Sequence, residues 1–277
     1  MLRFLCLAVA SLLFGCSSNA PPDESVGPHG SGIARAALTT SGYHWRTHAA
    51  PSLHLHYLPD SYAAQHIQEF ARKAEAALRH DLALIGQPSP PEPLELFLVN
   101  SREQAKQLTG NSYMGQAIPG EMSAFFVVLP GVQPAFRHEI MHALSLSLWG
   151  THRTGSWLSE GVATWAAGTC QGKSVDAIAA GFLREGQLLS LSELAAQFWS
   201  MDELNAYLTA GSAVGYVART RGNAAIEALW RQPHEAPGHP LGHKGAEIEV
   251  AWRSYLTSVP AAEVDTILLR RHGCEQV

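Results

Sequence analysis

The chain has 277 residues, of which 46% are hydrophobic and 16% charged, and its formal net charge at pH 7 is -5. This balance is typical of a soluble globular protein and provides for one sizeable domain. The charge is too small and too evenly spread to indicate nucleic-acid binding or electrostatic attachment to a membrane. Small molecules and peptides therefore stay open as substrates.

The first residues have the pattern of an export signal. Arg3 is followed by an apolar run at 4–14 that contains no acid and is too short to span a membrane as a mature helix. The run ends in Leu-Phe-Gly-Cys at 13–16, which resembles the lipobox of bacterial lipoproteins. The resemblance implies that residues 1–15 are a signal peptide, that Cys16 is acylated, and that the protein is anchored by lipid in the bacterial cell envelope.

The alternative is an ordinary signal peptide that is cut elsewhere, with Cys16 incidental. Both interpretations place the protein outside the cytosol, where Cys170 and Cys274 can form a disulfide, although two buried thiols are an equal alternative. Under the lipoprotein sorting pattern, Ser17 after the cysteine favours the outer membrane, with the domain facing the periplasm.

Residues 16–42 are rich in Ser, Pro, Gly and Ala without an apolar period, which predicts a flexible tether. Residues 43–277 are then one domain. Its first part, to about residue 150, is expected to be a sheet lobe, and the part from 151 to 277 a helical lobe.

Strands are expected only in the first lobe. The alternation from Leu53 to Tyr57 predicts a strand with one buried face and with His54 and His56 turned to solvent. Asp60 is expected to cap the following helix. The elements predicted here are strands at 53–57, 94–99 and 123–129, a long amphipathic helix from about 60 to 86, and a short helix that begins at Ser101.

The second lobe has an almost entirely helical pattern. Helices are predicted at 134–149, 156–168, 191–199, 203–220, 222–231 and 244–257. Because strands and helices segregate along the chain, the fold class is expected to be α+β.

The motif His138-Glu139-x-x-His142 lies inside the first of these helices. Two histidines four residues apart are about 40° apart around a helix, so both imidazoles can reach one metal ion. Glu139 lies at the adjacent position, where it can act as a base on a water molecule without being a ligand. A catalytic zinc site needs a third protein ligand, and Glu160 at the start of the next helix is the candidate.

The motif can also arise by chance in a chain with 14 histidines, and its residues would then have only a structural role. Its position within a predicted helix favours a metal site. So does the glutamate on a second helix, reached across a glycine-containing turn.

These stretches resemble the gluzincin metallopeptidases, in particular the peptidase MA-like domains of bacterial envelope proteins. The resemblance extends from about residue 53 to 256. It rests on the H-E-x-x-H motif, on Trp-Leu-x-Glu-Gly-x-Ala at 157–163, and on the stretch Tyr-Leu-Thr-Ala-Gly-Ser-Ala-Val-Gly-Tyr at 207–216.

The resemblance implies a thermolysin-like domain with an active-site cleft between its two lobes. It also implies a Zn²⁺ ion held by His138, His142 and Glu160, and a peptide or protein substrate. Tyr207 best matches the tyrosine that supports the transition state in similar proteins, and Tyr216 is the second choice.

One position departs from the family pattern. Thermolysin-like enzymes carry an aspartate four residues after the glutamate ligand, which orients a zinc-bound histidine, whereas this chain has Thr164. A backbone carbonyl or Thr164 itself is then left to orient the histidine.

The predicted function is a zinc-dependent metallopeptidase with Glu139 as the base. The alternatives are a metal-binding lipoprotein module that serves an envelope partner without turnover, and an amide hydrolase that acts on cell-wall peptides. The strand at 123–129 is either an exposed sheet edge that accepts a peptide as an added strand or a buried core strand.

Overall fold

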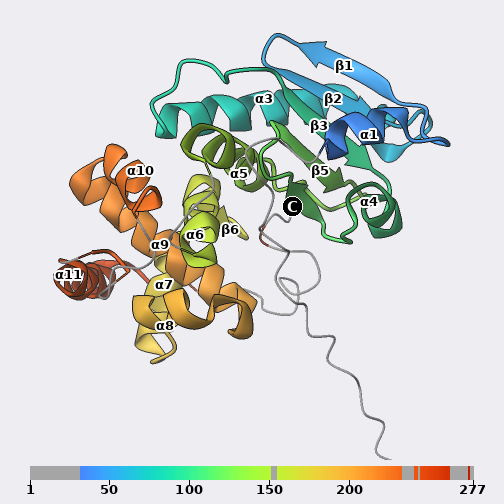
Figure 1. Cartoon of the computed structure of the whole chain (residues 1–277). Helices are drawn as coiled ribbons and strands as arrows, with labels where there is room; N and C mark the ends of the chain where they lie inside the picture. Colours follow the sequence, from blue (N-terminus) through green and yellow to red (C-terminus); the bar gives the residue numbers. More distant parts are fainter. Residues whose placement is uncertain (1–31, 151–154, 233–239, 243, 263–273, 275–277) are drawn as a thin grey trace, which may run out of the picture.

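The computed structural model of the chain describes residues 32–150, 155–232, 240–242, 244–262 and 274 (Figure 1). They form an α+β fold, as predicted, in which a five-stranded mixed sheet precedes most of the helices. The predicted signal peptide and Cys16 lie outside the described residues. Among the described helices, none combines the length and apolar character needed to cross a bilayer.

The main sheet has the strand order β1-β2-β3-β5-β4. Its strands are β1 (Arg46–Ala50), β2 (Leu53–Tyr57), β3 (Leu94–Val99), β4 (Gly115–Ala117) and β5 (Ser123–Val127). The three central strands are parallel, and the two edge strands, β1 and β4, run antiparallel to their neighbours. Every residue of β5 is buried, and the strand lies between β3 and β4, so the buried alternative is confirmed and the exposed edge is wrong.

Two helices cover one face of the sheet. These are α3 (Ile67–Leu84) and α5 (Phe136–Trp149), whose apolar residues pack with those of the strands in one core cluster. Strand residues two apart share a face, which explains why Leu94, Leu96 and Leu98 all contribute to this cluster. The core holds α5, and therefore the H-E-x-x-H motif, firmly against the sheet.

The opposite face is covered in part by α1 (Ile33–Thr39). Its Ala34 and Ala37 pack with Phe97 and Phe125 of the sheet, and Glu121 accepts hydrogen bonds from the backbone at the start of the helix. The predicted tether of residues 16–42 is therefore wrong for 33–39. Its small residues gave no apolar period, but they allow a close approach to the sheet.

Two side chains before α3 differ from prediction. Ser61, rather than Asp60, caps α2 (Tyr62–Gln65) by accepting a hydrogen bond from Ala64 N–H, whereas Asp60 has a φ of 59°. The short α2 precedes α3 in the stretch predicted as a single helix.

His56 is buried, with 5% of its surface exposed, and does not face solvent as predicted. Its ring stacks on Phe97 at 4.7 Å, and Nε2 contacts Glu95, whose other carboxylate oxygen is 2.9 Å from His54 Nδ1. The carboxylate supplies the polar partner that a buried imidazole needs, which alternation along one strand does not reveal.

The helices of the second half lie beside this sheet region, in yellow to red in Figure 1. They are α6 (Ser156–Ala167), α7 (Val175–Arg184), α8 (Leu191–Gln197), α9 (Glu203–Arg221), α10 (Ala224–Trp230) and α11 (Gly245–Ser258), with a 3-10 turn η1 (Phe198–Ser200) after α8. Every helix predicted for this region is present within a few residues. The sequence did not predict α7 or the small hairpin of β6 (Thr169–Cys170) and β7 (Lys173–Ser174), nor the edge strands β1 and β4 of the main sheet. Helix α4 itself (Arg102–Thr109) begins after Ser101, as predicted.

Helices α6 and α9 cross at very short range because glycines lie in their contact. A Cβ on Gly161 would lie 3.0 Å from Val214, and one on Gly211 would lie 2.6 Å from Thr164 Cγ2. Only glycine leaves room for this approach. The crossing fixes the position of α6 relative to α9.

Cys170 and Cys274 form a disulfide across 104 residues of sequence. The bridge ties Cys274, the last described residue, to the β6–β7 hairpin, where Gln171 N–H also donates to the Cys274 carbonyl. The structure thus selects the paired alternative for these cysteines.

Candidate metal centre

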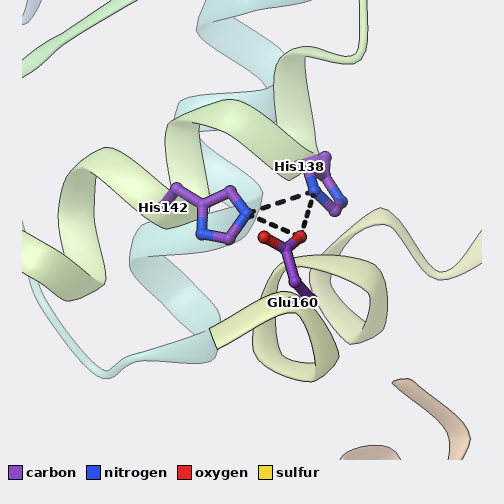
Figure 2. Close-up of side chains that lie close together, drawn as sticks. All are labelled: His138, His142 and Glu160. Atoms are coloured by element: carbon purple, nitrogen blue, oxygen red, sulfur yellow. Dashed lines mark hydrogen bonds and ion pairs between the residues drawn. The ribbon is translucent and has the colours of Figure 1, made fainter. Parts of the chain in front are cut away.

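The two histidines of the motif lie one turn apart on α5, and Glu160 lies in the first part of α6 (Figure 2). Helices α5 and α6 pack against each other, so the three side chains point into one space. The Nε2 atoms of His138 and His142 are 3.2 Å apart, and each lies 3.2 Å from Oε2 of Glu160. Within the described part of the chain, no other group of His, Cys, Asp or Glu converges in this way.

The dimensions of this triangle fit a zinc ion. Tetrahedral N and O ligands at about 2.05 Å from zinc lie about 3.3 Å from one another. The observed sides are all 3.2 Å, so the three atoms would need almost no movement to bind one ion. Two imidazoles and one carboxylate are also a ligand set found in catalytic zinc sites, and they leave the fourth position open.

The electrostatics of the cluster favour a cation. Burial raises the pKa of the Glu160 carboxyl, but the charge of His142 and hydrogen bonds from both imidazoles outweigh it and hold the pKa well below its usual range. Burial lowers the pKa of His142, whereas the Glu160 and Glu139 carboxylates raise it, and the raised pKa prevails. A buried negative charge that faces two imidazole nitrogens can be balanced by a proton or by a metal ion.

The Glu139 side chain contacts β4. Its Oε2 accepts a 2.9 Å hydrogen bond from Ala117 N–H, and a Cβ on Gly115 would lie only 2.6 Å from its Oε1. Glu139 as a whole residue is 8% exposed, and it is not one of the three converging side chains. The predicted base therefore lies on the same helix as His138 and His142, but its carboxylate contacts β4.

Backbone hydrogen bonds show which side of β4 is free for pairing. Val127 N–H donates to the Met114 carbonyl and Ile118 N–H to the Ser123 carbonyl, so these alternate positions face β5. In an antiparallel pair the intervening residues, Gly115 and Ala117, direct their backbone groups to the other side. Glu139 thus lies on the unpaired edge of the sheet.

Ser159 orients one of the histidines. Its hydroxyl is buried and lies 3.3 Å from Nδ1 of His142, on the ring edge opposite to the metal-facing Nε2. Thr164 does not replace the missing aspartate, because its hydroxyl has no hydrogen-bond partner and its methyl group packs against Gly211. Ser159 was missed by sequence reasoning, because its direction depends on how α5 and α6 cross.

Of the two tyrosines considered, Tyr207 lies at the cluster. Its ring is nearly parallel to that of His138, with centroids 6.0 Å apart. Burial first, and then the negative charges of Glu160, Glu203 and Glu139, raise the pKa of the Tyr207 hydroxyl far above its usual value. Tyr216 lies further along α9, where it contacts Tyr255 at 5.5 Å.

Comparison with known proteins adds no further assignment. No protein-family model matches the chain, and no curated protein matches it in sequence. The resemblance to gluzincins accordingly stays a prediction from the motif residues.

Proposed function

We propose that the chain is a zinc-dependent metallopeptidase of the gluzincin type, with the metal held by His138, His142 and Glu160. The observation that carries the proposal is the triangle of three donor atoms with 3.2 Å sides. Glu139, next to His138 on the same helix, supplies a carboxylate for proton transfer. A purely structural His-Glu contact would not need a second imidazole nitrogen 3.2 Å from the first. We also infer the gluzincin arrangement, in which a cleft separates the sheet lobe from the helical lobe.

A bound zinc ion would supply Lewis-acid polarisation of the substrate carbonyl and would lower the pKa of a water molecule. Glu139 then accepts a proton from the attacking water and returns it to the leaving amine, which is the usual work of a carboxylate base. The hydrogen bond from Ala117 N–H holds one oxygen of Glu139 and leaves the other for this transfer.

Tyr207 is the candidate donor to the oxyanion that forms on the substrate carbonyl. A phenol keeps its proton at neutral pH, because its ordinary pKa is about 10. Stacking against His138 places the ring at the border of the metal site, and burial limits competition from water. A preorganised donor of this kind stabilises developing negative charge.

The substrate main chain is proposed to pair with β4, in place of the β5 segment favoured by the sequence. The Gly115 backbone and the Ala117 carbonyl face the unpaired edge of the sheet, where Glu139 is held by the Ala117 N–H. An extended peptide that adds a strand there would pass the base and the metal ligands.

The cellular setting is part of the same proposal. We infer a lipid anchor at Cys16 and a place in the bacterial envelope. Fractionation of cells that express Cys16→Ala tests this inference, because the variant should be released from membranes. The disulfide between Cys170 and Cys274 supports an oxidising compartment, since such bridges are rare in the cytosol.

Metal analysis of the purified mature chain, together with cleavage of a peptide library, tests the function. One zinc ion per chain is expected in the native protein and in Glu139→Gln, whereas His142→Ala should lose it. The Gln variant should hydrolyse peptides about 10² to 10⁴ times more slowly. Equal activity of the native and Gln forms would overturn the mechanism.

The substrates used in this assay separate the alternatives. Casein peptides and purified cell-wall peptides are compared, because zinc and a carboxylate base serve any amide carbonyl. Cleavage of wall peptides alone would identify a cell-wall amide hydrolase. Stoichiometric zinc without cleavage of either would identify a binding module.

A further inference from the structure

A pocket of about 310 Å³ lies between the start of α6 and the α8–η1 segment. Gly155 and Ser156 line one side, and residues 195–200 line the other. None of these residues carries a charge, and the largest among them are Phe198 and Trp199. The composition of the walls suits an apolar group and offers no counter-charge for an ionic one.

The pocket begins one helical turn from a metal ligand. Ser156 and Glu160 are four residues apart on α6, so they share a face of the helix, with Cβ atoms roughly 6 Å apart. Side chains on a helix lean toward its N-terminus, which directs Glu160 toward the turn that carries Ser156.

Aromatic rings connect the pocket to the metal centre from the other side. Phe198 contacts Tyr207 with ring centroids 5.3 Å apart, and Tyr207 stacks on His138 at 6.0 Å. Phe198 is 6% exposed and closes the pocket toward the core. The pocket is thus separated from the cluster of His138, His142 and Glu160 by the packed rings of Phe198 and Tyr207, so a side chain in it would lie near the cluster but not within it.

Trp199 lines the pocket with a ring that is partly exposed and is fixed by two contacts. It is 48% exposed, which is unusual for the largest apolar side chain. Its Nε1–H donates a 2.8 Å hydrogen bond to Ser156 Oγ, so the indole is fixed to the first turn of α6. The ring contact with Phe198, at 5.3 Å, fixes it from the second side.

We propose that this pocket receives a large apolar side chain of the peptide substrate and that Trp199 determines this preference. The inference rests on the proposed function, because the occupant is a residue near the bond that the metal site cleaves. The volume accommodates a leucine or phenylalanine side chain, and the Trp199 indole is part of the lining. Peptides with small residues at that position bind without filling the pocket.

The test uses peptide pairs that differ only by phenylalanine or alanine, placed in turn at each of the three positions on either side of the cleaved bond. The native chain should prefer phenylalanine at one position by about tenfold or more in kcat/KM. Trp199→Ala should remove most of this preference, so that the ratio of kcat/KM for the phenylalanine and alanine peptides falls toward one. Trp199→Phe, which keeps a ring, should retain part of it.

Val250→Ala is the matched control, since Val250 is 69% exposed on α11 and outside the pocket. Its selectivity should equal that of the native chain. Zinc content and thermal unfolding of each variant show whether Trp199→Ala disturbs the metal centre or the fold. An equal loss for both peptides of a pair, or no loss, would overturn the assignment.

Equilibrium binding separates this inference from the peptidase proposal. The same labelled peptides are titrated by fluorescence anisotropy into Glu139→Gln and into Glu139→Gln/Trp199→Ala, neither of which needs turnover. Tighter binding of the phenylalanine peptide that disappears with Trp199 supports the pocket, even if the native chain cleaves nothing. Cleavage without any dependence on Trp199 supports the peptidase and rejects the pocket.

Discussion

The Cα of Gly115 faces the Glu139 carboxylate so closely that an added Cβ would lie 2.6 Å from Oε1 and 2.9 Å from Cγ. Gly115→Ala should therefore displace Glu139 without touching the metal ligands. We expect kcat to fall by about ten- to a hundredfold, since small displacements of a catalytic group have large effects, while zinc content stays native. Steady-state kinetics and metal analysis of the same preparation measure both quantities.

A double variant checks that this loss acts through the base. In a Glu139→Gln background the base is already absent, so Gly115→Ala should cost much less activity than in the native chain. Additive losses in kcat would show that Gly115 acts on something other than Glu139.

Ser159→Ala should weaken zinc binding by about tenfold or more, because the variant removes the group that faces Nδ1 of His142. The measurement is a zinc dissociation constant from competition with a chelator. Thr164→Val is the matched control on the same helix, since the Thr164 hydroxyl has no partner and contributes nothing to the ligands. Equal zinc affinity of Ser159→Ala and Thr164→Val would contradict the orienting role.

The cluster of His138, His142 and Glu160 could be predicted from sequence because its geometry is local. Two histidines four residues apart must share a helix face, and a glutamate at the start of the following helix can fold back beside them. Tyr207 came from the family resemblance. Its placement next to His138 in the structure depends on the whole length of α9, which no single motif specifies.

Other features could not be predicted because they depend on tertiary contacts. The strand β4 has only three residues, Gly115–Ala117, and no apolar alternation, yet it forms the edge of the sheet. The burial of His56 depends on Glu95 in the neighbouring strand. The pairing of Cys170 with Cys274 depends on a contact between residues 104 positions apart in the sequence.

The Glu95 carboxylate between two histidines predicts a pH dependence of stability away from the metal site. Burial raises its pKa, but hydrogen bonds and charge from His56 and His54 outweigh it, and the folded-state pKa is lowered. A lowered pKa adds stability above the unfolded value of about 4.3, and this contribution is lost as pH falls through the folded value. Glu95→Gln should lower the denaturation midpoint at pH 7 and differ less from the native chain at pH 3.

Urea unfolding of the zinc-free chain at the two pH values measures this difference. Glu75→Gln is the control, because Glu75 is paired only with Arg79 on the surface of α3, at 3.8 Å. Exposed pairs of this kind contribute little, so its midpoint should follow the native chain at both pH values. A Glu95→Gln deficit that is as large at pH 3 as at pH 7 would show that packing, and not ionisation, is the cause.

The α6–α9 crossing gives a prediction that links stability to the site, because α6 carries Glu160 and α9 carries Tyr207. Gly211→Ala would place a Cβ 2.6 Å from Thr164 Cγ2 and 2.8 Å from its Cβ, which forces the helices apart. We expect a loss of about 1–3 kcal/mol in unfolding free energy, the usual cost of overpacking, together with weaker zinc binding.

Thr164→Ala in the same chain removes the methyl group that makes the nearest contact, so the double variant should recover part of both losses. Recovery of stability without recovery of zinc affinity would separate the packing of α6 and α9 from the geometry of the ligands. Chemical unfolding and chelator competition on the native chain, both single variants and the double variant form a complete cycle for the two quantities. If the losses of stability in the two single variants simply add in the double variant, the cost of Gly211→Ala does not come from its contact with Thr164, and the prediction is wrong.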